Sequence, residues 1–190
     1  MKEQPRIGEC MEATAVLLDA FTRVHDGLHR TLADCTEEEL YKEPHPPIGW
    51  LAWRWNRVLD SNISRLGGQE QLWIANGWHA KFGMEPEPAD FGRGLTHTRE
   101  QVRAFHAASE LLLAYHDVVF DRTKSYLANV TPQELSRELD EPQYTPLPTV
   151  GVRIVSLLEN AISNMGQIGY LKAYHRVGGW FPSEMTSPTR

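Results

Sequence analysis

Apolar residues recur at intervals of three and four along four long stretches of the chain, a spacing that predicts four amphipathic helices. The predicted helices run roughly over residues 8–33, over residues 47–67, from Thr98 onward, and over residues 150–176. Period-two alternation never persists long enough to predict a β-strand. The recurring residues form a stripe along one face of each helix, and the second and third stripes include the polar Asn62 and His116. In chain order the four stripes are formed by Leu17, Phe21, Val24, Leu28 and Leu32; by Leu51, Trp55, Val58, Asn62 and Leu66; by Val102, Phe105, Leu112, His116 and Val119; and by Leu158, Ile162, Met165 and Gly169.

The segments between these helices carry capping and turn signals. Thr36, followed by acidic residues, predicts the N-cap of a short helical turn, and Pro47 suits the first position of the second long helix. Gly67 and Gly68 suit its C-terminal end. The connection over residues 69–97 is long enough to hold structure of its own or to contribute to a site.

The pattern as a whole predicts an all-α fold, an antiparallel four-helix bundle with long crossover connections. A second connection, residues 131–148, is expected to hold a short helix after the cap-like Thr131. We expect one domain over residues 1–181, followed by a frayed tail over residues 182–190.

Composition narrows the function classes. The 190 residues carry a net charge of −6 with scattered basic residues, and this balance argues against a nucleic-acid surface. Apolar runs such as residues 111–115 are too short to cross a bilayer, so no membrane partner is expected. Charged residues interrupt any signal-like segment at the N-terminus, and Cys10 and Cys35 are expected to be free thiols. These features predict a reduced, cytoplasmic protein.

Three parts of the chain resemble the DinB-like superfamily, which includes the N-terminal domain of mycothiol-dependent maleylpyruvate isomerases. The likeness covers nearly the whole chain in one register. It is carried by Pro47-Ile48-Gly49-Trp50-Leu51-Ala52-Trp53 leading into residues 73–83, by residues 97–102 with residues 110–117, and by residues 151–156 with Gly166-Gln167-Ile168-Gly169-Tyr170.

The resemblance implies an up-down-down-up bundle, commonly a homodimer. It also implies a divalent metal, zinc or nickel, held by three histidines, one on the second helix and two on the fourth. A metal bound in this way keeps an open position and lowers the pKa of a bound thiol or water. The implied chemistry is thiol transfer or isomerisation with a low-molecular-weight thiol such as mycothiol or bacillithiol.

The residues at the implied ligand positions are not histidines. The second-helix position falls on Arg54, whose guanidinium offers no lone pair. The fourth-helix positions fall on Asn160 and Asn164, whose amide oxygens are weak ligands for a transition metal. We therefore expect no metal at this position and predict no cofactor.

The same positions suggest a polar pocket. A guanidinium among amides suits a carboxylate-bearing or phosphate-bearing small molecule. Alternatively, Arg54 occupies the volume of the lost metal, and the two asparagines accept its hydrogen bonds. The residues expected to line the pocket are Trp50, Arg54, His116, Asn160, Asn164 and Gln167.

Histidines provide the remaining candidates. His116 lies on the inward stripe of the third helix, so it is a candidate acid or base, although a core histidine is the commoner role. His25 and His29 are four residues apart, a pair that can bind zinc with a third ligand, but they also fit a partly exposed helix face.

Three functional hypotheses follow. The first is a DinB-like protein with a degenerate metal site that binds a small polar or anionic molecule or is non-catalytic. The second is a metal-independent thiol S-transferase or isomerase that uses Arg54 and His116 as catalytic residues. The third is a metalloenzyme whose ligands have moved, for example to His116 or His175.

Overall fold

The computed structural model describes residues 12–42, 46–89 and 97–177. Within these ranges the chain is helical and has no strand, apart from an isolated bridge between Glu138 and Thr149. The all-α prediction is therefore confirmed. The long helices are α1 (Ala13–Leu32), α3 (Ile48–Leu66), α7 (Ser109–Asn129) and α9 (Val150–Val177), and the short ones are α2 (Glu37–Tyr41), α4 (Leu72–Ala75), α5 (Trp78–Lys81), α6 (Arg99–Ala104) and α8 (Pro132–Ser136).

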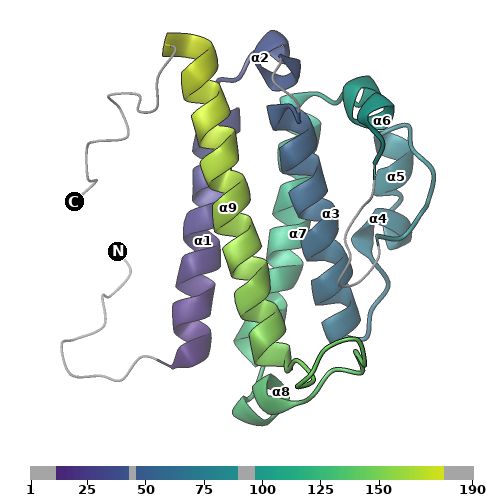
Figure 1. Cartoon of the computed structure of the whole chain (residues 1–190), viewed down its shortest axis with the longest axis vertical. Coiled ribbons are helices and arrows are strands. Elements are labelled where there is room, and N and C mark those ends of the chain that lie inside the picture. Colours follow the sequence, from purple (N-terminus) through teal and green to yellow (C-terminus); the bar gives the residue numbers. More distant parts are fainter. Residues whose placement is uncertain (1–11, 43–45, 90–96, 178–190) are drawn as a thin grey trace, which may run out of the picture.

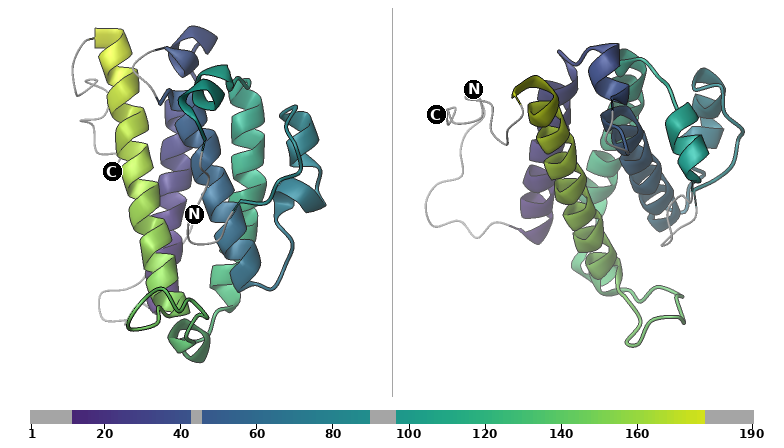
Figure 2. Two further views of the ribbon diagram at one scale, coloured as in Figure 1. Left: turned by 45° about the vertical axis from the view of Figure 1, so that its right-hand side comes forward. Right: turned by 45° about the horizontal axis from the view of Figure 1, so that its top comes forward.

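The four long helices form an antiparallel bundle. Helices α1 and α3 each pack against both α7 and α9, so α1 lies diagonally opposite α3. Helices α1 and α9 run in one direction, and α3 and α7 run in the other (Figure 1). This is an up-down-down-up order. The connection from α3 to α7 climbs the outer side of the bundle and carries α4, α5 and α6 (Figure 2).

Helix α3 is buried on nearly all sides because this connection covers the face that the bundle leaves open. The predicted stripe residues Leu51, Trp55 and Leu66 are buried, and Trp53 packs edge-on against Trp73 of α4 at a centroid distance of 5.9 Å. Most of the tryptophans therefore stabilise the core, the role that large aromatic side chains usually have.

A buried carboxylate fixes the start of the connection. Asp60 of α3 is fully buried and accepts hydrogen bonds from the backbone N–H groups of Leu72 and Trp73, each at 2.9 Å. The Tyr115 hydroxyl of α7 donates to the same carboxylate at 2.8 Å, and the Ser64 hydroxyl donates at 3.0 Å. Asp60 thus joins α3, α4 and α7, and it supplies the acceptors that the first turn of α4 requires.

The third long helix begins later than the sequence predicts. Thr98 caps the short α6, which ends at Ala104, and the chain is extended at Phe105 and Ala108 before α7 begins. The hydroxyl of Tyr41 explains the break, because it donates to the carbonyl of Ala107 and accepts from its N–H. These bonds satisfy backbone groups that a continuous helix would otherwise pair internally.

Other local predictions are confirmed. Thr36 forms a capping box with Glu39 at the start of α2, and Thr131 caps α8. Pro47 is the N-cap residue of α3 rather than its first helical residue, and Gly67 is the C-cap. Cys35 is a free thiol. Cys10 and the tail over residues 182–190 lie outside the described residues.

Ion pairs join the end of α9 to α1 and α2. Hydrogen bonds from Lys172 and then Arg176 hold the pKa of Asp34 at about 2, and Arg176 likewise lowers the pKa of Glu39 to about 2. Folded pKa values below the unfolded values stabilise the protein above about pH 4, and this stabilisation is lost as pH falls toward 2.

We expect Arg176→Gln to reduce the free energy of unfolding at pH 7 by only about 1 kcal/mol, because the Asp34 side chain is 60% exposed and water screens the pair. The difference from the unsubstituted protein should shrink as pH is lowered to 2. Urea unfolding across this pH range measures it. Arg30→Gln is the control, since Arg30 is exposed and has no ion pair among the described residues. If the two substitutions had equal effects, the ion pairs of Arg176 would not contribute to stability.

The outward face of α9 carries several exposed apolar and aromatic side chains. Its exposed large side chains are Val152, Val155, Ile162, Tyr170 and Tyr174. Within the described part of the chain, no helix combines the length and apolar character needed to cross a membrane. The homodimer expected from the resemblance stays a prediction.

Candidate metal centre

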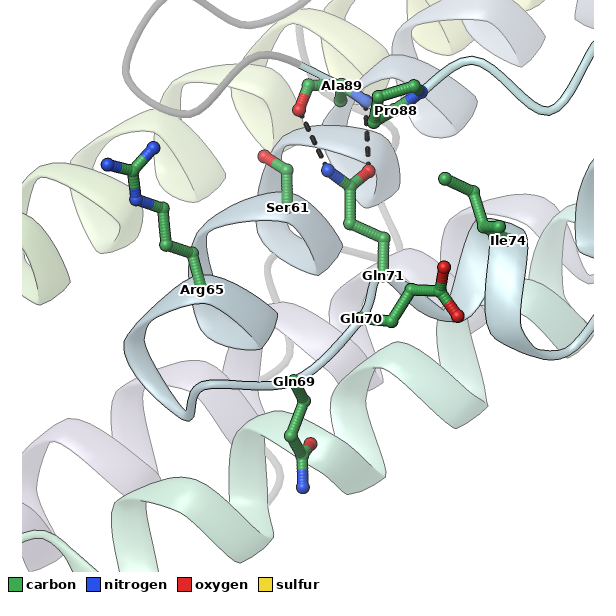
Figure 3. Close-up of a pocket in the computed structure, with 8 residues that line it drawn as sticks. All are labelled: Ser61, Arg65, Gln69, Glu70, Gln71, Ile74, Pro88 and Ala89. Atoms are coloured by element: carbon green, nitrogen blue, oxygen red, sulfur yellow. Dashed lines mark hydrogen bonds between the residues drawn. The ribbon is translucent and has the colours of Figure 1, made fainter.

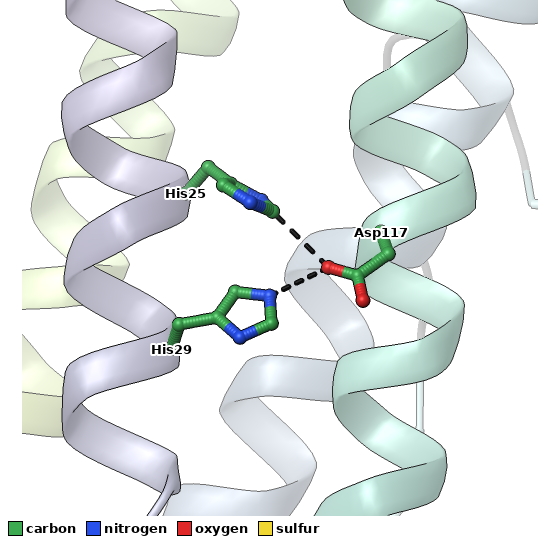
Figure 4. Close-up of side chains that lie close together, drawn as sticks. All are labelled: His25, His29 and Asp117. Carbon is green, nitrogen blue, oxygen red and sulfur yellow. Dashed lines mark hydrogen bonds and ion pairs between the residues drawn. The ribbon is translucent and has the colours of Figure 1, made fainter.

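Three potential metal ligands converge between α1 and α7 (Figure 4). His25 and His29 lie one turn apart on α1, and Asp117 reaches toward both from α7. One oxygen of Asp117 lies 2.5 Å from Nε2 of His29 and 4.0 Å from Nδ1 of His25. One ligand atom from each of the three residues lies within 4.8 Å of the others.

The helix register explains this convergence. On α1, His25 and His29 each follow a buried stripe residue, Val24 and Leu28, so both imidazoles lie at the edge of the core. Adjacent helical residues point about 100° apart, so Asp117 lies at the edge beside the inward-facing His116. The packing of α1 on α7 brings the two edges together, and solvent still reaches the site, since the Asp117 side chain is 47% exposed.

His116 lies directly behind this cluster. Its ring is buried, and its centroid is 4.9 Å from that of His25 and 6.1 Å from that of His29. On its other side, Nδ1 lies 2.7 Å from the amide oxygen of Asn56 on α3. Nδ1–H therefore donates to Asn56, and Nε2 keeps its lone pair. Within the described part of the chain, neither Nε2 of His116 nor Nδ1 of His25 has a hydrogen-bond partner.

The electrostatic environment favours neutral imidazoles beside a negative charge. Burial, followed by the neighbouring His25 and His29, lowers the pKa of His116 to about 3. Burial and then His29 also lower the pKa of His25, against the opposing effect of Asp117, Asp26 and Asp121. A neutral imidazole is the form that binds a metal, and the nearby carboxylates favour a cation.

The donor set has the chemistry of a transition-metal site. Two imidazoles and one carboxylate form the protein ligands of several zinc enzymes, and the same set is found at mononuclear non-haem iron. Ligand atoms around one such ion lie about 3–3.5 Å apart when bonds are about 2.0–2.2 Å long. The separations here range from 2.5 Å between His29 and Asp117 to 4.0 Å between His25 and Asp117, so these half-buried side chains would have to rotate to share one ion.

The structure divides the pocket predicted from the sequence into separate groups. Arg54 lies 5.8 Å from the ring of Trp50, and Trp50 donates to His97. Asn164 donates to the backbone and side-chain oxygens of Asn160. Gln167 is exposed and contacts Ser163, while His116 packs against His25, behind the cluster between α1 and α7. Among the described residues, no hydrogen bond or ring contact joins these groups.

The metal position implied by the resemblance does not fit the residues present. Arg54 is half-buried and offers no lone pair, and the amide of Asn164 is already used within α9. The expected hydrogen bonds from Arg54 to the asparagines are not observed among the described residues. His175, near the end of α9, is half-buried and has no metal-ligand partners within the described part of the chain.

A hollow separate from this cluster lies beside the C-terminal end of α3 (Figure 3). Its volume is about 550 Å³, and it is open and lined by both polar and apolar side chains. The side-chain amide of Gln71 pairs there with the backbone N–H and carbonyl of Ala89, which holds the connection against the bundle. The lining residues do not present a cluster of metal-ligating or nucleophilic groups, so this hollow is not the candidate site. They are Ser61, Arg65, Gln69, Glu70, Gln71, Ile74, Pro88 and Ala89.

Sequence reasoning identified the histidine pair and the inward His116 but missed their association. The partly exposed face is confirmed for His25 and His29, whose side chains are 20% and 37% exposed. The third member of the cluster, Asp117, follows His116 directly in the sequence. Only the pairing of α1 with α7 reveals that these residues meet.

Comparison with known proteins relates this chain to a solved structure. No family model matches the chain, and no curated protein matches it either. A crystal structure described as the conserved protein of a locus from Enterococcus faecalis superposes with a TM-score of 0.76 at 31% sequence identity. The match covers 86% of this chain and 97% of that one. The chain belongs to the family of this Enterococcus protein. The family membership supports the helical fold and carries no named activity.

Proposed function

We propose that this protein binds one divalent transition-metal ion between α1 and α7, with His25, His29 and Asp117 as ligands. The observation that carries the proposal is the convergence of these three side chains from two helices within 4.8 Å. In this proposal the metal lies at a different place from the one that the resemblance implies at Arg54, Asn160 and Asn164.

An ion pair between His29 and Asp117 alone accounts for less of the geometry. It leaves Nδ1 of His25 without a hydrogen-bond partner among the described residues, although that nitrogen lies 4.0 Å from the same carboxylate. It also leaves three imidazoles packed together, with His25 and His29 only 4.6 Å apart between centroids. A cation between these groups satisfies the free lone pairs and the carboxylate together.

The alternative of a metal-independent transferase has weaker support. His116 would be its acid or base, but the ring is only 1% exposed and its pKa is lowered to about 3. A general base that operates near neutral pH needs a pKa closer to 7 and access to substrate. Arg54 is placed at a different interface and contacts Trp50 rather than His116.

Titration of tag-free, metal-stripped protein with Zn²⁺ tests the proposal by calorimetry. We expect one site per chain. His29→Ala and Asp117→Asn should each weaken binding by more than roughly 10–100-fold, the loss that typically follows substitution of a residue that hydrogen-bonds to a metal ligand. Absence of binding in the unsubstituted protein would refute the proposed function.

Two controls separate this site from other sources of affinity. His106→Ala removes an exposed histidine that packs on Tyr41, outside the cluster, and should leave the affinity unchanged. Asn164→Ala alters the position implied by the resemblance and should also leave it unchanged. A large loss in the Asn164 variant, with none in the His29 variant, would place the metal at the α9 position instead.

A further inference from the structure

The buried His116 has no role in a site formed by His25, His29 and Asp117 alone. We infer that its Nε2 is the fourth ligand, so that three imidazoles and one carboxylate close the coordination shell. This inference rests on the proposed metal site and decides its type: structural zinc sites are closed with four protein ligands, whereas catalytic sites keep an open position.

The first support is the direction of the His116 ring. Nδ1 and Nε2 point to nearly opposite sides of an imidazole. Nδ1 donates to Asn56 on α3, so Nε2 lies on the side of the ring away from α3, and the helix diagonally opposite α3 is α1, which carries His25 and His29. Nε2 is buried and has no hydrogen-bond partner among the described residues. A buried lone pair left without a partner is costly, and few remain in folded proteins.

The second support is the spacing of the rings. Two imidazoles on one tetrahedral zinc, with bonds of about 2.0–2.1 Å, have ring centroids roughly 5 Å apart. The three centroid distances here are 4.6 Å, 4.9 Å and 6.1 Å. Three rings from two helices therefore already lie near the separation that a shared ion requires.

The side chains have to rotate before they can share an ion, because neither ring nitrogen of His116 lies within 4.8 Å of all three ligand atoms of the cluster. The ring of His25 is nearly parallel to those of His116 and Phe120, with interplanar angles of 19° and 13°. Its free nitrogen turns toward a shared ion by rotation about the bond from Cβ to the ring, a broad torsion. The backbone of α1 does not have to move.

Asn56 is a positioning residue in this arrangement. Metal-binding histidines usually donate their second ring N–H to an oxygen, which fixes the tautomer and the orientation of the ring. The 2.7 Å hydrogen bond from His116 to Asn56 has this geometry. Asn56 is fully buried on α3, so α3, which lies diagonally opposite α1, would fix the orientation of the His116 ring.

A closed shell predicts a structural metal that joins α1 to α7 and does not admit substrate. It also separates this protein from a thiol-dependent transferase, because an added thiol has no position to occupy. The ligand class is a tetrahedral divalent ion, zinc above all, since zinc has no geometric preference of its own that opposes four protein ligands.

Co²⁺ as a spectroscopic substitute for zinc tests this inference. The Co²⁺-loaded protein should show the intense visible bands of a four-coordinate ion, and 2-mercaptoethanol should not change them. X-ray absorption should count three imidazoles. In His116→Ala, binding should weaken by more than about 100-fold, and the thiol should add a sulfur-to-cobalt charge-transfer band.

Asn56 variants test the positioning role without deleting a ligand. Asn56→Leu should weaken Co²⁺ binding about 10–100-fold, and Asn56→Asp, which keeps an acceptor for the His116 N–H, should restore it. Circular dichroism verifies that each variant is folded.

The outcomes distinguish the two proposals. If the unsubstituted protein binds Co²⁺ but contains two imidazoles and responds to thiol, the fourth-ligand inference fails while the proposed function stands; a buried water would then satisfy His116. If the unsubstituted protein binds no Co²⁺, both fail.

Discussion

Replacing Asp60 with alanine should destabilise the protein by about 3–5 kcal/mol, the largest effect we expect from one polar substitution. The change leaves the N–H groups of Leu72 and Trp73 and the hydroxyl of Tyr115 without their buried acceptor. Such a loss is a large part of the roughly 5–15 kcal/mol that holds a typical domain folded. Urea unfolding at pH 7 measures it.

Asp121→Ala is the matched control. Asp121 lies on exposed α7 surface and pairs with Lys124 at 2.7 Å, three residues away. Exposed pairs of this kind contribute about 0–1 kcal/mol. If the two aspartate substitutions cost the same, Asp60 does not fix the connection from α3 to α7 in the way that its hydrogen bonds indicate.

Zinc at 100 times its dissociation constant should raise the midpoint of thermal unfolding by roughly 5–10 °C. The binding free energy contributes about 2.7 kcal/mol at this ratio, and each kcal/mol shifts the midpoint of a chain of this size by about 2–4 °C. The shift should follow the zinc concentration and reverse on addition of a chelator. Thermal scans followed by circular dichroism measure both.

The double substitution His25→Ala and His29→Ala should abolish this zinc-dependent shift, because it removes both ligands on α1. In the absence of zinc its midpoint should lie close to that of the unsubstituted protein, since both side chains are partly exposed. A zinc-dependent shift that survives in the double variant would mean that the metal binds elsewhere.

The fold was largely predictable because the four apolar stripes have helical spacing over long stretches. There are two exceptions. In α9 the buried face is formed by residues such as Leu157, Ala161 and Ile168, and Ile162 of the predicted stripe is exposed. The other is the start of the third long helix. Its periodicity is continuous across residues 105–108, yet the chain is extended there, because Tyr41 from α2 binds the backbone of Ala107. Gly49 permits this approach, since a Cβ at that position would lie 2.8 Å from the Tyr41 hydroxyl. A contact between residues 66 positions apart leaves no signal in local periodicity.

The site was only partly predictable for a similar reason. Spacing along α1 places His25 and His29 on one face, and the stripe of α7 places His116 inward. Which faces meet depends on how α1 packs on α7, and this packing places Asp117 opposite the histidine pair. The resemblance pointed to Arg54 and the two asparagines, whereas the side chains able to bind a metal meet between α1 and α7.

Asn56 shows the limit most clearly. Its position on α3 is predictable, but it lies outside the predicted apolar stripe, and its burial reflects the cover over nearly all sides of α3. The hydrogen bond to His116 joins residues 60 positions apart. Without that bond, His116 is an ordinary core histidine, whereas the bond fixes its tautomer and leaves the lone pair on Nε2.

Anomalous diffraction at the zinc absorption edge, from crystals of tag-free protein grown with Zn²⁺, shows directly where the metal binds. We expect a single strong peak between α1 and α7, about 2.0–2.2 Å from nitrogen atoms of His25 and His29 and an oxygen of Asp117. A peak beside Arg54, Asn160 and Asn164, or a map without a peak in the cluster while zinc is bound elsewhere, would contradict it.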